Sequence, residues 1–454
     1  MRYPYRSWEW MSPGGFPGLQ HRWRVALRAA VGSTPMHSRL RILFERYYQK
    51  DSYFTMPTSD LPNIDDFTPI VQKHFRIEEV TWGDSRQNFL VRYRGELTRD
   101  SAEAYDVLSA ELKKYKTTVL FREQDGQHII LLVKGLIEPQ PSNPWINLGL
   151  FLATLLSMLY VGAANVFEGT SAEFYGNILA NLASGFPYAG SLLAILLAHE
   201  FGHYLAGRYH KIAVTLPYFI PLPLLGGFGT LGAAIRLKEP PKNKRVLLDI
   251  GIAGPLAGLV VAIPIVLVGL SNSELGTLPD VAILEGNSIL YLVAKYITLG
   301  EWLPMPVSFD GVHPFLYWAK YLITGLPVPI GGQDVLLSPM AWAGWAGLLV
   351  TAINLIPTGQ LDGGHTLYSL IGDKVSKSRP YILTLLLLMG LMYSGWWLWA
   401  LLIYFLGRNH AEPYDQITPL DPNRKVMAVF TLIIFILVFI PVPLRMIGIA
   451  GAGF

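Results

Sequence analysis

Long apolar stretches separated by short polar connections dominate the chain from residue 145 onward. Residues 145–167 carry no charged side chain. They begin with a tryptophan, which suits a membrane interface. A second apolar region is broken at Gly185-Phe186-Pro187 and continues to about Arg208, and a third covers 246–270. Helices of this length and polarity cross a bilayer, so the pattern predicts several membrane spans.

The remaining apolar segments are less regular. They are 341–356, 381–406 and 427–442, with two shorter pieces at 289–299 and 315–326. The two shorter pieces are too short to span alone and are predicted to be interfacial or re-entrant. Residues 381–406 form either one tilted span or a hairpin around Ser394-Gly395.

Residues 69–135 have a different pattern, typical of a small soluble domain. Phe89, Val91 and Tyr93 alternate with polar positions as in a half-buried strand, and Asp100 with a glutamate three residues later predicts a helix start. Two further strands follow around the turn Asp125-Gly126. The expected order is β-β-α-β-β, and the expected role is sensing or substrate filtering, with a solubilising appendage as the alternative.

The pattern therefore divides the chain into four parts. Residues 1–68 are a basic, disordered extension, in which Met36 is an alternative start of translation; 69–135 are the small α+β domain; 136–144 are a proline-rich linker; and 145–450 are the membrane domain. The predicted fold class is a polytopic α-helical membrane protein with a small N-terminal α+β domain.

Composition supports this division. The chain of 454 residues is 51% hydrophobic and only 15% charged, and its mean hydropathy is positive. The net charge of +3 is too small to indicate a nucleic-acid partner. With no cysteine, the chain has neither disulfides nor thiolate ligands, so any metal must be held by His, Asp or Glu.

The candidate chemistry begins with an HExxH sequence inside the second apolar region. Four residues apart on a helix, His199 and His203 project from the same face and can bind one divalent metal ion, with Glu200 beside them as a general base. Burying these polar groups unpaired in a membrane costs about 2 kcal/mol or more each, which favours function over a hydrogen-bonded core histidine.

A second polar segment follows in residues 354–365. The loop 236–245 is rich in Lys and Arg and is predicted to face the cytoplasm, as does the nearby end of the HExxH helix. A span at 341–356 that starts outside must end on the cytoplasmic side. It therefore brings Asn354 and Asp362 to the membrane level of His199 and His203. Asp362 is the predicted third ligand, with His365 as its competitor, and the two glycines after Asp362 let the backbone bend close to the metal.

The role of Asn354 has two interpretations. Its side chain either donates a hydrogen bond to the scissile carbonyl or the substrate backbone, or joins two helices. Asp249, near the start of the 246–270 span, is either the partner of a nearby base or an acid behind the metal ligands. The same span carries a small-residue patch that permits close helix packing, made of Gly251, Ala253, Gly254, Ala257 and Gly258.

Residues 215–232 are too rich in Pro and Gly for a helix and too apolar for an ordinary loop. They are predicted to form a re-entrant, β-like hairpin against the site. Its unpaired backbone groups suit an extended peptide that adds a strand, and the alternative is a packed plug without substrate contact.

The chain resembles the site-2 proteases, the zinc intramembrane metalloproteases of peptidase family M50. Two motifs carry the resemblance: HExxH in one span, and in a later span Asn354-Leu355-Ile356-Pro357-Thr358-Gly359-Gln360-Leu361-Asp362-Gly363-Gly364. The GQLDGGH form and the preceding α+β domain are more similar to the branch of plant chloroplast EGY proteases and their bacterial relatives. The resemblance covers roughly residues 60 to 450, without a PDZ-like insertion.

This resemblance implies a membrane-embedded metalloprotease core. It implies that His199, His203 and Asp362 hold one Zn²⁺ per chain, that Glu200 is the general base, and that membrane-anchored proteins are cut in or near their spanning helices. It also implies an integral membrane location, in the bacterial cytoplasmic membrane or alternatively a chloroplast membrane, with the active site towards the cytoplasmic or stromal side. The oligomeric state does not follow from the sequence.

Two rival functions remain. A membrane metal-ion transporter would also place His and Asp inside the bilayer, and it predicts further ligands at matching depth in other helices. A catalytically silent membrane scaffold would need a missing catalytic position, and none is missing here.

Overall fold

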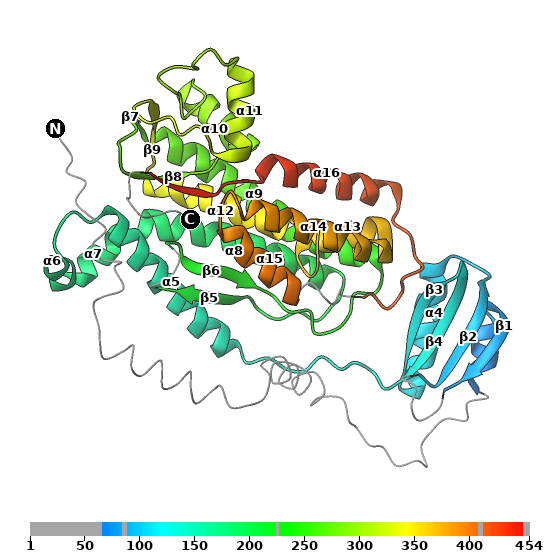
Figure 1. The fold of residues 1–454 in the computed structure, drawn as a ribbon. Coiled ribbons are helices and arrows are strands. Elements are labelled where there is room, and N and C mark those ends of the chain that lie inside the picture. The colour runs from blue at the N-terminus through cyan, green and yellow to red at the C-terminus, as the bar shows by residue number, and fades with distance from the viewer. Residues whose placement is uncertain (1–65, 84–88, 224–226, 407–411, 448–454) are drawn as a thin grey trace, which may run out of the picture. The chain divides into compact units, whose positions relative to one another are not determined.

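The computed structural model describes residues 66–83, 89–223, 227–406 and 412–447 (Figure 1). The helices are α3 (Phe67–Gln72), α4 (Ser101–Leu112), α5 (Pro144–Val166), α6 (Ser171–Gly176), α7 (Ile178–Ser184), α8 (Phe186–Tyr209), α9 (Lys244–Ser271), α10 (Ile289–Leu299), α11 (Pro314–Thr324), α12 (Pro339–Asn354), α13 (Asp362–Ile371), α14 (Val375–Met389), α15 (Gly395–Leu406) and α16 (Pro422–Val438). The strands are β1 (Phe75–Trp82), β2 (Val91–Leu97), β3 (Thr117–Gln124), β4 (Gln127–Lys134), β5 (Tyr218–Leu222), β6 (Gly229–Ala234), β7 (Glu274–Thr277), β8 (Ala282–Glu285), β9 (Gln333–Leu336) and β10 (Leu444–Ile447). Nearly all of the basic extension predicted at 1–68 lies outside the described residues.

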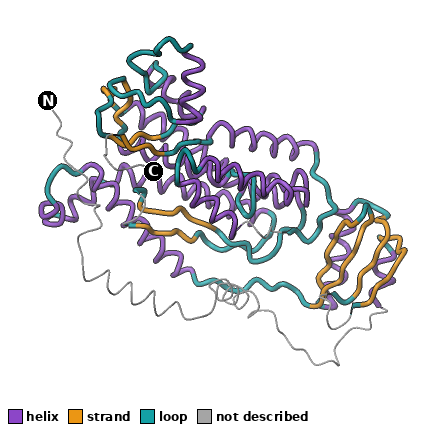
Figure 2. The backbone as a smooth tube through the Cα atoms, in the orientation of Figure 1, coloured by secondary structure: helices purple, strands orange, loops and turns teal. Residues whose placement is uncertain are grey.

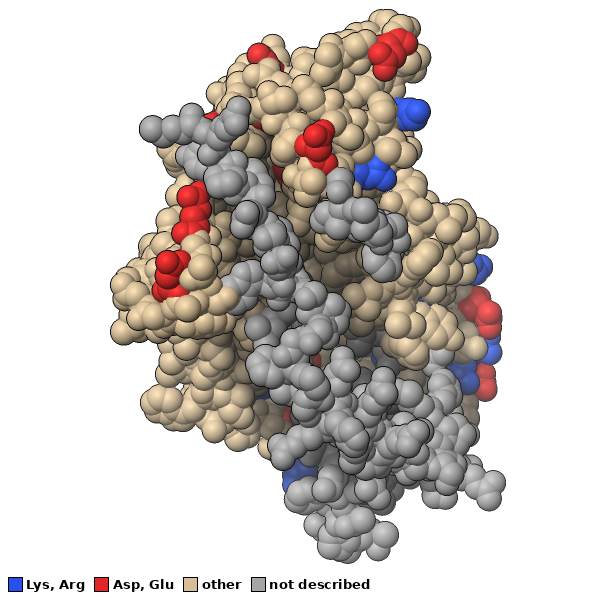
Figure 3. Space-filling model, turned by 60° about the vertical axis from the view of Figure 1, so that its left-hand side comes forward, with Lys and Arg blue, Asp and Glu red and all other residues tan. Residues whose placement is uncertain are grey.

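The described part is mostly helical with small sheets (Figure 2). Its largest apolar core lies between α5, α8, α9 and α12. Among the described residues, α5 and α9 are each long and apolar enough to cross a membrane. The pair α7 and α8 meets the same criterion together and is bent by 56° at Gly185, where the sequence predicted a break. The visible described surface in Figure 3 is mostly uncharged, as a lipid-facing surface requires.

The C-terminal apolar region is a helical hairpin rather than one tilted span. Helices α14 and α15 pack against each other across the turn that contains Ser394. Trp396 is buried in the cluster between them and α16, where its ring stacks on Phe439. The hairpin interpretation of residues 381–406 is therefore confirmed, and each of its helices is shorter than a simple span.

The N-terminal elements form an antiparallel sheet of order β1-β2-β4-β3 with α4 packed on one face (Figure 1). Asp100 caps α4 by accepting hydrogen bonds from the backbone amides of Ala102 and Glu103, so the predicted helix start is confirmed. Residues 413–418 hydrogen bond to both β3 and the chain before α9: Phe121 N–H donates to Tyr414, and Asp415 N–H donates to Lys242. This segment thus connects the sheet with the start of α9.

The predicted extended hairpin is present as β5 and β6, which pair antiparallel beside α5. Side chains of neighbouring helices bind four of its carbonyls: Asn147 donates to Leu216 and Pro217, Ser157 to Gly229, and Tyr188 to Phe228. Non-helical backbone at membrane depth needs such partners, because lipid offers none.

Residues 272–338 lie between α9 and α12 and contain the two short apolar helices α10 and α11. Strand β7 pairs with β9, and β8 pairs with β10 from the end of the chain. Lys295 of α10 is fully buried there, with its ammonium 2.8 Å from Glu285 and 3.4 Å from Asp334. Burial raises the pKa of Asp334 to about 6, even though the lysine opposes the shift.

Candidate metal centre

Helix α8 carries the HExxH residues on the face that packs against α9 and α12. His199, Glu200 and His203 are buried, each less than a tenth exposed. The i, i+4 spacing places both imidazoles on one side, with their Nε2 atoms 3.2 Å apart.

Asp362 reaches this pair from a sharp turn. Helix α12 ends at Asn354, and after seven residues α13 begins with Asp362 itself. A Cβ on Gly363 would lie 1.9 Å from the carbonyl oxygen of Leu355, and one on Gly364 would lie 2.5 Å from that of Gly359. The two glycines therefore close the turn onto itself, rather than bringing backbone to the metal as the sequence suggested.

The three ligand atoms form a nearly equilateral triangle. Asp362 Oδ2 lies 3.4 Å from His199 Nε2 and 3.3 Å from His203 Nε2. A tetrahedral zinc ion with ligands at about 2.0–2.1 Å separates its ligand atoms by about 3.3 Å. These side chains are the group among the described residues that fits a metal ion, and three protein ligands leave a coordination position open.

Helix α9 orients the imidazole of His203. His203 Nδ1 donates to the carbonyl of Ile250 at 2.7 Å, so in the neutral imidazole the free lone pair is on Nε2, which lies 3.3 Å from Asp362 Oδ2. The predicted small-residue patch makes this approach feasible, because Gly254 faces the His203 ring and Gly258 faces His199. Close packing through the patch is thus confirmed.

Gly254→Ala is expected to empty the site without removing a ligand. The added Cβ would lie 2.0 Å from His203 Nε2, so the ring must leave its position although alanine favours the helix by about 1 kcal/mol. We expect at least about a tenfold loss of metal affinity, measured by metal analysis after equilibration with chelator. Gly149→Ala in α5, where a Cβ meets nothing within 4 Å, should bind metal like the wild type. Unchanged binding by Gly254→Ala would show that the ring position is not required.

Glu200 lies beside the ligand triangle and is not part of it. The backbone amide of Ile235, just after β6, hydrogen bonds to its carboxylate, and Oε2 is buried without a hydrogen-bond partner among the described residues. A buried carboxylate oxygen without a partner is costly, which is a reason to expect water or substrate there.

The other predicted residues take different positions. Asn354 Nδ2 lies 3.4 Å from His199 Nε2, at the edge of the ligand group. His365 is outside the group that could hold a metal ion, one turn further along α13, where it packs near Gly251. Asp249 accepts from Arg424 at 2.6 and 2.8 Å and lies 2.9 Å from His210, so it is the partner of nearby bases.

Sequence reasoning missed the backbone groups of Ile250 and Ile235. Side-chain patterns carry no signal for a carbonyl or amide used in this way. The spacing of Gly254 and Gly258 was the sequence feature that could have indicated the contact of α9 with the imidazoles, since a gap in a helix surface must face something bulky. The contact between Asp249 and Arg424 had no local signal, because 175 positions separate them.

Comparison with known proteins agrees with this geometry. Residues 187–393 match the family model described as Peptidase family M50. The probable zinc metalloprotease EGY2, chloroplastic, of Arabidopsis thaliana is 26% identical over 371 residues, which are 79% of this chain and 61% of that protein. The EGY1 protein of Oryza sativa subsp. japonica is 30% identical over 340 residues, 68% of this chain and 53% of that protein. EGY1 of Arabidopsis thaliana is 29% identical over 345 residues, covering 69% and 56%.

The chain thus spans between about half and three fifths of the length of these relatives. The family match includes both the HExxH helix and Asp362. Residues 187–393 are therefore a peptidase family M50 domain, that of the site-2 proteases, in a chain similar to the EGY zinc metalloproteases over most of its length.

Proposed function

We propose that this protein is an intramembrane zinc metalloprotease that hydrolyses peptide bonds in or near the spanning segments of membrane-anchored proteins. The observation that carries the proposal is the convergence of His199 and His203 from α8 with Asp362 from α13 on one ion-sized space. The names of the relatives as zinc metalloproteases support zinc as the metal.

Bound zinc supplies an activated water at neutral pH and polarises the peptide carbonyl. Glu200 is placed to accept the proton of that water and to return it to the leaving amine, since its Oε2 has no other partner among the described residues. The bond from His203 Nδ1 to Ile250 selects the neutral tautomer whose Nε2 lone pair would bind the metal. Asn354, at the edge of the group, can donate to the substrate carbonyl.

The β5–β6 hairpin is proposed to hold the substrate in extended form. A helical substrate hides its amides in internal hydrogen bonds and must unwind before attack. The hairpin is a two-stranded sheet in the described structure, so its outer edges can accept a further strand. It is also continuous with Ile235, which bonds to Glu200.

The chain is proposed to be a multi-pass membrane protein with its active site towards the cytoplasmic or stromal side. The basic loop 236–245, close to the end of α8, supports this orientation through the positive-inside rule. The membrane is proposed to be bacterial or chloroplast, and residues 69–135 to be a separate soluble domain with a sensory or substrate-filtering role. Domain boundaries at 68, 135 and 144 belong to the same proposal.

Asp362→Asn tests this function. Asparagine keeps the size of the side chain but removes the charged ligand, so the purified full chain should lose at least 90% of its zinc and of its cleavage of a reconstituted single-span test protein (roughly a tenfold or larger effect). Asp373→Asn, at an exposed position just after α13, is the matched control. Cleavage that survives in zinc-free Asp362→Asn protein would refute the proposed function.

A further inference from the structure

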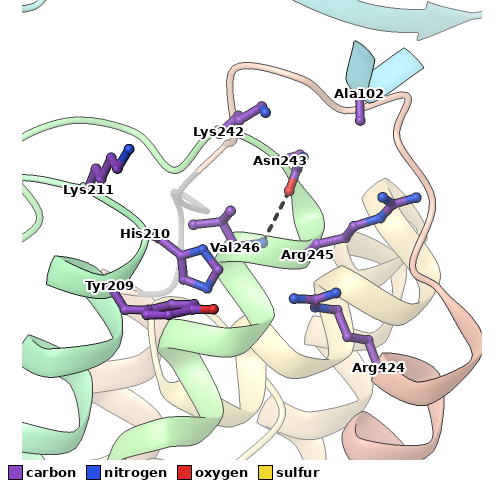
Figure 4. Close-up of a pocket in the computed structure, with 9 residues that line it drawn as sticks. All are labelled: Ala102, Tyr209, His210, Lys211, Lys242, Asn243, Arg245, Val246 and Arg424. Carbon is purple, nitrogen blue, oxygen red and sulfur yellow. Dashed lines mark hydrogen bonds between the residues drawn. The ribbon is translucent and has the colours of Figure 1, made fainter. Parts of the chain in front are cut away.

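A cavity of about 430 Å³ lies where α8 ends and α9 begins, apart from the metal group. Five basic side chains line it, His210, Lys211, Lys242, Arg245 and Arg424, and no lining residue is acidic. Figure 4 shows Tyr209, His210 and Lys211 on one side, with Arg245 and Arg424 on the other. Pockets of about this size hold small ligands.

Some of this positive charge is already balanced by carboxylates outside the lining. Asp249 pairs with His210 and Arg424, Asp421 pairs with Arg424, and Lys242 pairs with Asp106. Lys211 and Arg245 have no carboxylate partner in the described part of the chain; Arg245 uses its Nε–H on the carbonyl of Pro419. Two cations therefore remain for a ligand.

The backbone at Lys211 closes the end of α8, because its own amide donates to the carbonyl of Arg208 and the amide of Ile212 donates to that of Gly207. This residue follows α8 with a φ of +60°, the left-handed conformation in which many helices end. This helix end fixes where the Lys211 side chain starts on the wall of the cavity.

We propose that this cavity binds a phosphate group. A phosphate carries one negative charge as a diester and up to two as a monoester, and its acceptor oxygens match a lysine ammonium and an arginine fork placed on opposite sides of a cavity. A transition metal would be repelled by this lining. A carboxylate, with only two oxygens, would bind only part of the hydrogen-bond donors in this lining.

The position of the cavity favours the headgroup of an anionic phospholipid as the source. It lies at the ends of two apolar helices, and Tyr209 and Leu205 beside it are 82% and 62% exposed. Aromatic side chains of this kind sit at headgroup level, and basic pockets on the cytoplasmic side bind anionic headgroups. A soluble phosphate, such as that of a nucleotide, is the other source of the same chemistry.

Occupancy would affect the catalytic helix directly. His210 directly follows the last residue of α8, seven positions after His203, and Arg424 lies in the first turn of α16. A bound phosphate would therefore hold together the end of α8, the start of α9 and the beginning of α16.

The test uses the full zinc-loaded chain in neutral detergent and measures thermal unfolding, not cleavage, so its outcome is independent of the proposed protease function. The probes are dioctanoyl phosphatidylglycerol, dioctanoylglycerol as its phosphate-free counterpart, and ATP without magnesium. We expect saturable stabilisation by the phosphatidylglycerol and none by dioctanoylglycerol, with the apparent affinity at least about tenfold weaker in Lys211→Gln/Arg245→Gln.

Lys377→Gln, which removes an exposed lysine of α14, is the control and should bind like the wild type. Stabilisation by ATP alone, lost in the double variant, supports the phosphate site and assigns it to a soluble ligand. The exposed single variant Lys211→Gln covers the case in which the double variant does not fold. Absence of any phosphate-dependent shift, or equal affinity in wild type and Lys211→Gln, would overturn the proposal.

Discussion

Glu200→Gln is expected to keep one zinc ion per chain and to lose cleavage by about a thousandfold. The amide has the shape of the carboxylate but cannot take a proton from water at neutral pH, and general acid–base groups contribute roughly 10²–10⁴ to rates. Glu200 is outside the triangle of ligand atoms, so the metal group should be unaffected. Zinc is measured by metal analysis and cleavage by single-turnover assay of a reconstituted single-span protein.

The control for this variant is Glu168→Gln, at an exposed glutamate before α6, which should retain full activity. The variant also separates the two functional classes. A metal-ion transporter would keep its transport rate in Glu200→Gln as long as the ion still binds, whereas a protease stops cutting. Loss of zinc together with activity would instead mean that Glu200 supports the ligands, and its role as a base would have to be abandoned.

The centre of the site was predictable because each step used a short-range rule. The i, i+4 spacing of His199 and His203 fixes their common face on any helix, and the charge of loop 236–245 predicts which end of the span they occupy. Counting spans then brings Asp362 to the same level. The structure places its carboxylate within 3.4 Å of both rings, so the predicted group forms.

The surroundings of the site were not predictable in the same way. Gly254 showed that something must pack closely on α9, but not that it is the His203 ring, because this depends on how far α8 is turned about its axis. The pairing of Asp249 with Arg424 depends on where α16 returns to α9, which no local pattern encodes. Tertiary packing decides such contacts.

Residues 271–338 show a different limit. They hold six acidic residues and two lysines, Lys295 and Lys320, and such a low basic content predicts by itself an outward-facing surface. The structure instead buries Lys295 completely, next to Glu285 and Asp334. Its apolar neighbours in α10 carried that signal, since a lysine in a wholly apolar helix must either extend to water or find acids.

The second large effect is expected from Lys295→Met. Methionine has a similar length and no charge, so Glu285 and Asp334 would remain buried without their counter-ion. Breaking a buried ion pair from one side costs about 3–5 kcal/mol. We expect a loss of this size in the free energy of unfolding, measured by denaturant titration in detergent micelles, because Tyr291 and both strands β8 and β9 pack around this group.

Two further variants show whether charge or packing is responsible. Lys320→Met, at an exposed lysine of α11, should change stability by no more than about 0.5 kcal/mol. Lys295→Met combined with Glu285→Gln and Asp334→Asn should recover most of the loss, since no buried charge remains. If the triple variant is as unstable as Lys295→Met alone, lost packing rather than unpaired charge is the cause.

The loss in Lys295→Met should also depend on pH. Burial raises the pKa of Asp334 to about 6, so the folded protein holds this proton more tightly than the unfolded chain does. The stability that Asp334 contributes is therefore present at low pH and is lost as the pH rises through about 6. Removing the lysine raises this pKa further, so at about pH 5 Asp334 is neutral and only Glu285 needs compensation. The destabilisation should be clearly smaller at about pH 5 than at about pH 7.5, and an equal loss at both would exclude Asp334 as the unpaired charge.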